Sequence, residues 1–80
     1  MYAFVIFNYI LNMTKKEYPE EHLIKYFDDL GRIVQIDFLQ SGNSCYITYV
    51  NDTNQKSTVT WNNGFTYVHN NDGSVTELRN

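Results

Sequence analysis

Three side chains of the 80-residue chain could take part in nucleophilic chemistry: the thiol of Cys45 and the imidazoles of His22 and His69. A thiol beside an imidazole can act as a nucleophile, provided that the fold brings the two within hydrogen-bond distance. Nothing in the spacing brings Cys45 to either histidine, because Cys45 falls in the middle of an expected strand. We therefore expect that the protein is not an enzyme and that Cys45 is a small buried hydrophobic residue. A hydrolase that uses this thiol is the last of three functional hypotheses.

The acidic residues include two adjacent pairs, Glu20–Glu21 and Asp28–Asp29. Adjacent residues of a helix point in different directions, so neither pair can direct two carboxylates at one site. The histidines and the cysteine are far apart in the sequence, and residues 52–56 lack the regular oxygen ligands of a calcium loop. The glycines fall at expected turns and not in a phosphate-binding loop. The sequence therefore predicts no metal and no cofactor.

The element expected to position these acidic residues is an amphipathic helix from Pro19 to Leu30. Proline suits the first helical position, and the two glutamates after it favour the positive end of the helix dipole. Leu23, Phe27 and Leu30 recur at intervals of four and three residues, which places them on one side of a helix. Gly31 supplies the left-handed residue that commonly ends a helix. The pattern therefore predicts a helix whose apolar side packs on a sheet.

The rest of the chain has the alternation and the turn residues of β-strands. The Asn-Asn-Gly sequence at residues 62–64 is the strongest hairpin signal. Strands are expected over residues 2–11, 32–40, 44–50, 57–61, 65–68 and 74–78. The predicted fold class is α+β, with residues 1–80 forming a single small domain. One N-terminal strand and one amphipathic helix are expected, the helix packed on a four- to five-stranded, mostly antiparallel meander sheet.

The charge pattern and the N-terminal residues bear on partners and compartment. The formal net charge is −3, and the six lysines and arginines are scattered, which argues against a nucleic-acid partner. Residues 1–11 are apolar but have neither a basic start nor a small-residue cleavage site, and they are too few to span a bilayer. We therefore expect a cytoplasmic protein without membrane contact, in which the single cysteine stays reduced.

Residues 22–50 resemble the first helix and the second and third strands of the RNA-recognition motif. The shared pattern is Leu-x3-Phe-x3-Gly-x-Ile, which begins at Leu23. Tyr46 then matches an aromatic position of the third-strand signature, and the resemblance implies that it stacks on a base. The residues before Tyr46 depart from that signature, and the β-branched segment 57–61 stands where the family has its second helix. A helix over residues 52–62 would favour RNA binding, and a strand there would favour a protein partner.

The first functional hypothesis is a small non-enzymatic module that binds another protein and blocks its surface. A sheet covered by one helix leaves aromatic side chains on its open face, and such patches mark protein partners. Self-association through this face or an edge strand is a variant of the hypothesis. The residues expected to bind the partner are Tyr46, Trp61, Phe65, Tyr67, Glu20, Glu21 and Asp28.

The kind of inhibitor or adaptor is suggested only by size and charge. In both respects the chain is similar to the small proteins with which phages and mobile elements inhibit host defences such as CRISPR nucleases. The acidic side chains could then imitate phosphates against a basic groove. The second hypothesis is a degenerate binder of single-stranded RNA, similar to the RNA-recognition motif.

Overall fold

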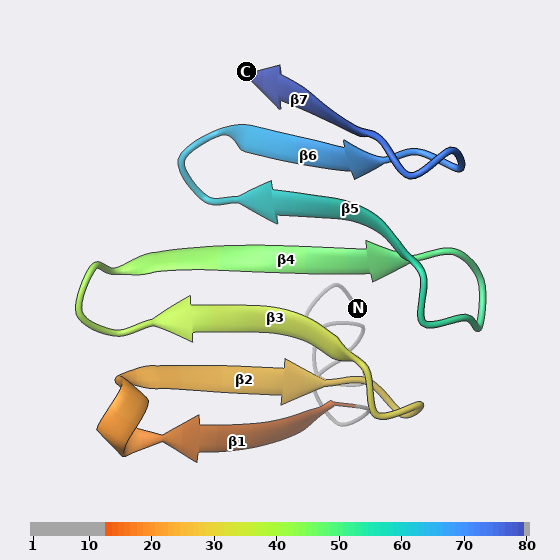
Figure 1. The fold of residues 1–80 in the computed structure, drawn as a ribbon. Coiled ribbons are helices and arrows are strands. Elements are labelled where there is room, and N and C mark those ends of the chain that lie inside the picture. The colour runs from red at the N-terminus through yellow and green to blue at the C-terminus, as the bar shows by residue number, and fades with distance from the viewer. Residues whose placement is uncertain (1–12, 80) are drawn as a thin grey trace, which may run out of the picture.

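The computed structural model describes residues 13–79, which form a single antiparallel sheet of seven strands (Figure 1). The strands lie in the sheet in their order along the chain, so each pairs only with its sequence neighbours. The elements are β1 (Thr14–Tyr18), a 3-10 turn η1 (Pro19–Glu21), β2 (Leu23–Phe27), β3 (Ile33–Phe38), β4 (Asn43–Tyr49), β5 (Lys56–Trp61), β6 (Phe65–His69) and β7 (Val75–Arg79). Residues 13–79 contain no helix that is long and apolar enough to cross a membrane.

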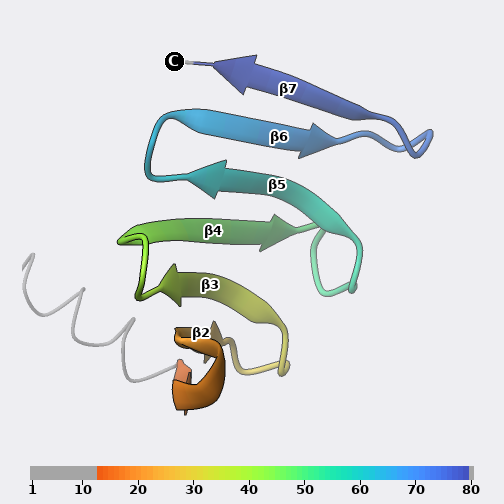
Figure 2. The same ribbon diagram turned by 60° about the vertical axis from the view of Figure 1, so that its left-hand side comes forward.

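The sheet is a twisted single layer. In the view turned by 60°, β2 is seen almost end-on, whereas β4 to β7 still run across the picture (Figure 2). Such twist follows from the preferred conformation of extended chains of L-residues. Within residues 13–79, every substantial contact between elements joins neighbouring strands, so no described element packs over either face.

The predicted helix from Pro19 to Leu30 is wrong, and with it the α+β fold class. Pro19 begins only the short turn η1, after which His22 adopts a left-handed backbone with φ of 58°. The next five residues, Leu-Ile-Lys-Tyr-Phe, form β2, which pairs with β1 on one side and β3 on the other. Isoleucine, tyrosine and phenylalanine favour strands, and in so short a segment apolar intervals of three and four fit either structure. Pairing on both edges of β2 therefore decides the conformation.

Gly31 has the left-handed backbone that was predicted, with φ of 78°, but it lies in a turn between two strands. Its N–H donates to the carbonyl of Asp28 at 3.0 Å, and the N–H of Asp28 donates to the carbonyl of Arg32 at 2.9 Å. Helix ends and hairpin turns both use residues with positive φ. A glycine in the sequence therefore could not distinguish the two.

The later strands are present where the sequence predicts them. The strands expected over residues 32–40, 44–50, 57–61, 65–68 and 74–78 correspond to β3 to β7. Residues 14–18, which were expected to form a polar connection, instead form β1. The strand expected over residues 2–11 lies outside the described residues. The described sheet thus has more strands than predicted, because the segment assigned to a helix forms β2, and β2 pairs with the further strand β1.

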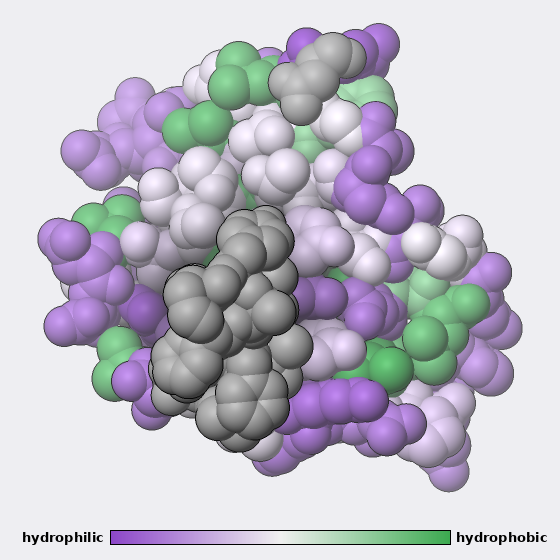
Figure 3. Space-filling view, turned by 180° about the vertical axis from the view of Figure 1, so that it is seen from behind, coloured by the Kyte–Doolittle hydropathy of each residue, from purple (hydrophilic) through white to green (hydrophobic). Residues whose placement is uncertain are grey.

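The two faces of the sheet carry different side chains. Residues opposite each other in antiparallel strands point to the same face, so the register assigns each side chain to a face. The aromatic face carries Tyr18, Leu23, Phe27, Ile36, Phe38, Cys45, Ile47, Val59, Trp61, Phe65 and Tyr67. The threonine face carries Tyr26, Gln35, Asp37, Ser44, Tyr46, Thr48, Thr58, Thr60, Thr66 and Thr76. Seen from behind, the upper half of the sheet shows mostly side chains of intermediate hydropathy, with hydrophilic ones gathered at its sides (Figure 3).

The core lies on the aromatic face at the middle of the sheet. Along β4, Cys45 and Ile47 are only 3% and 8% exposed, whereas the alternate residues Tyr46 and Thr48 are exposed. Trp61 is paired with Cys45 across β4 and β5, and its ring stacks on that of Phe38 at 5.6 Å between centroids. The stacked rings of Trp61 and Phe38 therefore lie beside Cys45, and Val59 lies beside Ile47.

Arg32 joins two turns at one end of the sheet. Its Nε donates to Oδ2 of Asp28 at 2.8 Å, and its Nη1 donates to the carbonyls of Asn51 at 2.9 Å and Thr53 at 2.6 Å. The guanidinium lies over the ring of Tyr49, 4.6 Å from the centroid. One side chain thus links the β2–β3 turn to the β4–β5 loop.

Candidate protein-binding face

Three aromatic side chains that the sequence singles out, Trp61, Phe65 and Tyr67, lie together on the aromatic face. With Asn43 and Asn63 they line a hollow of about 290 Å³. Trp61, Phe65 and Tyr67 are each half-buried, while both asparagines are exposed. Aromatic rings surrounded by amide groups can contribute both apolar area and directional hydrogen bonds.

The β5–β6 hairpin places these rings. The N–H of Gly64 donates to the carbonyl of Trp61 at 3.1 Å, and Gly64 has φ of 101°, which only glycine adopts readily. The N–H of Asn62 donates to the carbonyl of Ser44 at 3.0 Å and so fastens the turn to β4. Trp61 ends one strand and Phe65 begins the next, on the same face. The hairpin predicted from Asn-Asn-Gly is therefore confirmed.

Basic side chains lie against rings of the same face. Lys25 lies 4.8 Å from the ring centroid of Tyr18, and Arg79 lies 4.6 Å from that of Phe65. Cations over aromatic rings are attracted by the ring quadrupole, an effect of about 0.5–1 kcal/mol at exposed sites. The face thus combines apolar rings with positive charge at its margins.

Tyr46 lies on the opposite, threonine face and is 43% exposed. Near it, Asp37 accepts hydrogen bonds from Gln35 at 2.9 Å and from Ser44 at 2.8 Å. Burial alone would raise the pKa of the Asp37 carboxyl, but these hydrogen bonds outweigh it and hold the pKa below its ordinary value. Burial and the charge of Asp37 raise the pKa of Tyr26. Tyr46 therefore borders a charged, hydrogen-bonded cluster and does not join the other three aromatic residues.

The three acidic candidates lie at opposite ends of the sheet. Glu20 and Glu21 belong to η1, where they border a hollow of about 380 Å³. Asp28 lies at the other end, in the β2–β3 turn (Figure 1). There it accepts hydrogen bonds from Arg32 and from the N–H of Leu30. Asp28 thus stabilises its own turn, and the three acidic residues do not lie on one common surface.

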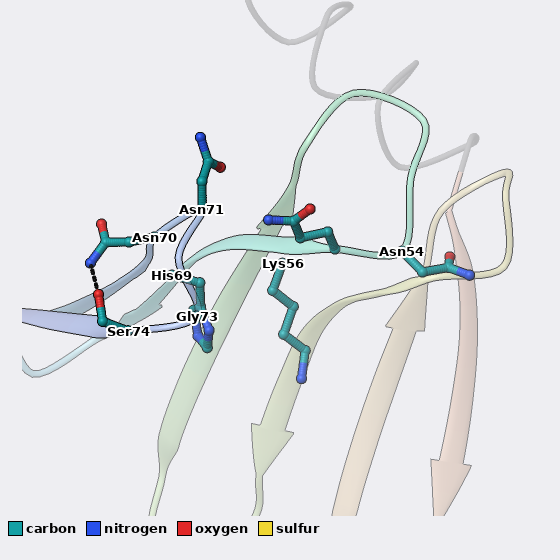
Figure 4. Close-up of a pocket in the computed structure, with 8 residues that line it drawn as sticks. Asn54, Lys56, His69, Asn70, Asn71, Gly73 and Ser74 are labelled. Carbon is teal, nitrogen blue, oxygen red and sulfur yellow. Dashed lines mark hydrogen bonds between the residues drawn. The ribbon is translucent and has the colours of Figure 1, made fainter.

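A further hollow in the described part of the chain was not singled out from the sequence. It has a volume of about 550 Å³ and lies between the β4–β5 loop and the β6–β7 turn (Figure 4). All but one of its lining residues have polar side chains: Asn54, Gln55, Lys56, His69, Asn70, Asn71, Gly73 and Ser74. The Asn70 amide donates to Ser74 and to Thr76, each at 2.9 Å, so it holds the turn together. The density of asparagine in the two turns was the signal that could have located this hollow.

The cysteine and histidine candidates do not form a catalytic pair. Cys45 lies opposite Ile36 on one side and Trp61 on the other. Burial raises the pKa of its thiol, which favours the protonated form over the nucleophilic thiolate. Among residues 13–79, no three side chains of the metal-binding types come together.

Comparison of the chain with protein-family models, with curated proteins and with solved structures finds no match in any of the three. Residues 22–50 resemble the RNA-recognition motif in sequence but not in secondary structure. These residues form β2, β3 and β4, and residues 13–79 contain no α-helix to match that family's helices. The segment 52–62, whose conformation separates the two main hypotheses, contains β5 and no helix.

Proposed function

We propose that the protein is a non-enzymatic module that binds another protein through the hollow lined by Trp61, Phe65 and Tyr67. The observation that supports this function is the gathering of three large rings on one face of a single-layer sheet, without a described element above them. Interface cores are enriched in tryptophan, tyrosine and phenylalanine, whose burial releases much apolar area at a small cost in side-chain entropy. The exposed amides of Asn43 and Asn63 supply the polar rim that such an interface has.

The proposal includes an inhibitor or adaptor that occupies a surface of its partner. Its compartment would be the cytoplasm, a reducing medium in which the free, buried thiol of Cys45 stays reduced. A group of the partner that enters the hollow would meet both the aromatic rings and the amides of Asn43 and Asn63. Acidic groups beside it would complement Arg79 at the margin of the face.

The proposal predicts that alanine at Phe65 or Tyr67 weakens capture of the partner at least about tenfold, as expected for an aromatic residue at the centre of an interface. The measurement is recovery of a nuclease-treated protein partner by tagged wild-type and variant proteins from the cells that encode the chain. The partner is identified by mass spectrometry, and its affinity for each variant is then measured with purified components.

The matched control is Tyr46→Ala, which removes an exposed tyrosine from the threonine face. It should leave capture unchanged. Circular dichroism of each variant establishes that the sheet is intact. If recovery is lost with nuclease, the partner is a nucleic acid and the proposal fails. An equal loss of partner capture in the Tyr46→Ala variant would also contradict the proposal, because the aromatic face would then not be the surface that binds.

A further inference from the structure

The strand β7 is an open edge of the described sheet. All five of its residues are exposed, and Val75 and Leu78 are 52% and 49% exposed, among the most exposed large hydrophobic residues. The other edge strand, β1, carries the charged run Lys-Lys-Glu, and charges of this kind discourage pairing with another chain. β7 has no such run, so its edge is the one suited to accept a further strand.

The hydrogen bonds of the β6–β7 hairpin show which backbone groups of β7 point outward. The N–H of Asn70 donates to the carbonyl of Ser74 at 2.8 Å, and the paired positions continue along the two strands to Phe65 and Arg79. Hydrogen-bonded and non-hydrogen-bonded pairs alternate in an antiparallel ladder. The backbone groups of Thr76 and Leu78 therefore point to β6, and those of Val75, Glu77 and Arg79 point away from the sheet.

These outward groups are complementary to a second copy of the same strand. In an antiparallel pair of β7 strands centred on Leu78, each Glu77 lies opposite the Arg79 of the other copy. Both residues have outward backbone groups, so each such pair would also exchange two hydrogen bonds. Leu78 then lies opposite the Leu78 of the other copy, on the threonine face of the sheet. Charge and apolar surface thus match in a single register.

Neighbouring registers are less favourable. A pair centred on Glu77 places two glutamates directly opposite each other, and like charges in that position destabilise a sheet. A pair centred on Thr76 places Glu77 opposite Val75. The side chains of Glu77 and Arg79 are 48% and 71% exposed, so both are accessible to a neighbouring copy, and the pairing between copies would replace the 3.7 Å ion pair that they form within one copy.

We propose that two copies of the protein associate edge to edge through β7, in the antiparallel register centred on Leu78. The product is a symmetric dimer with one continuous sheet, and the aromatic faces of both copies lie on the same side of it. This dimer uses the edge of β7, and Glu77 and Leu78 do not line the aromatic hollow, whereas Arg79 also lies over Phe65 at the margin of the aromatic face.

The test is sedimentation equilibrium of the purified chain over a wide concentration range at low salt, compared with two single charge reversals and their combination. The wild type should form a dimer of the 9.5 kDa chain. Glu77→Arg and Arg79→Glu should each weaken dimerisation about tenfold, because each creates two like-charge pairs across the strands. The double variant Glu77→Arg with Arg79→Glu should restore it, since it exchanges the charges without changing their match.

Several results would overturn this inference. A chain that is monomeric at every concentration excludes the dimer. Single reversals that dimerise like the wild type, or a double variant that stays as weak as the single ones, exclude this register. Assemblies that grow beyond two copies show a head-to-tail contact instead of a symmetric one. Circular dichroism shows whether each variant retains the sheet, and retention is expected because both side chains are largely exposed.

Discussion

Replacement of Ile47 by alanine is expected to lower the free energy of unfolding by about 3 kcal/mol, as for other buried aliphatic side chains. Ile47 is 8% exposed, and it and Cys45 are the only described hydrophobic residues that are buried to this degree. Val59 of β5 lies opposite it. None of the described strands packs over this face to close the resulting cavity. Urea denaturation followed by circular dichroism measures the loss.

The control for this variant is Leu39→Ala, because Leu39 is 56% exposed. Its effect should stay within about 0.5 kcal/mol, as for surface substitutions in general. If the two variants lose the same stability, Ile47 is not in the core and the assignment of the core to the aromatic face is wrong.

Replacement of Arg32 by alanine is expected to lower the free energy of unfolding by about 2 kcal/mol. Hydrogen bonds that involve a charged group contribute more to stability than hydrogen bonds between neutral groups. The substitution removes the ion pair with Asp28, in which the side chains are only 15% and 18% exposed. It also removes both hydrogen bonds to the carbonyls of Asn51 and Thr53. Arg32→Lys should recover only part of the loss, because an ammonium group cannot reproduce the geometry of the guanidinium.

The pH dependence of the Arg32 variant gives a second measurement. Burial alone would raise the pKa of Asp28, but hydrogen bonds and charge from Arg32 outweigh it and hold the pKa below its ordinary value. The resulting stabilisation is fully present above the pKa of the unfolded chain and is lost as pH falls through the lower folded pKa. Arg32→Ala should therefore lose less stability than the wild type on acidification through this range. A parallel loss in both proteins would contradict the role of the ion pair.

The sequence predicts the later strands well because their local signals agree. β-branched and aromatic residues alternate between turns rich in asparagine and glycine, and each turn joins neighbouring strands. In the β5–β6 hairpin this information suffices to bring Trp61, Phe65 and Tyr67 to one face. That part of the candidate site was therefore predictable from residue types alone.

Residues 14–30 were not predictable in the same way. Leu23 and Phe27 fit the spacing of a helix, but they belong to a strand that gains hydrogen bonds on both edges from β1 and β3. Such pairing depends on other segments and leaves no local signal. The wrong helix also misplaced Glu20, Glu21 and Asp28, which were expected on one element and lie at opposite ends of the sheet.

The position of Tyr46 depends on register. Alternate residues of a strand point to opposite faces of the sheet. Tyr46 lies between the two buried residues of β4, so it points away from the aromatic hollow. The sequence marks the strand but not which of its faces has the hollow. The polar hollow beside the β6–β7 turn was missed for a related reason, because it combines two loops that are distant in sequence.

The aromatic face is the surface that we propose contacts a protein partner. The most direct test places a photo-crosslinking amino acid, p-benzoylphenylalanine, at position 65 in one sample and at position 46 in another. Illumination in nuclease-treated lysate of the cells that encode the chain should produce a defined protein adduct from Phe65 but not from Tyr46. An adduct from Tyr46 alone, or no adduct from Phe65 when the same partner is captured, would contradict the claim.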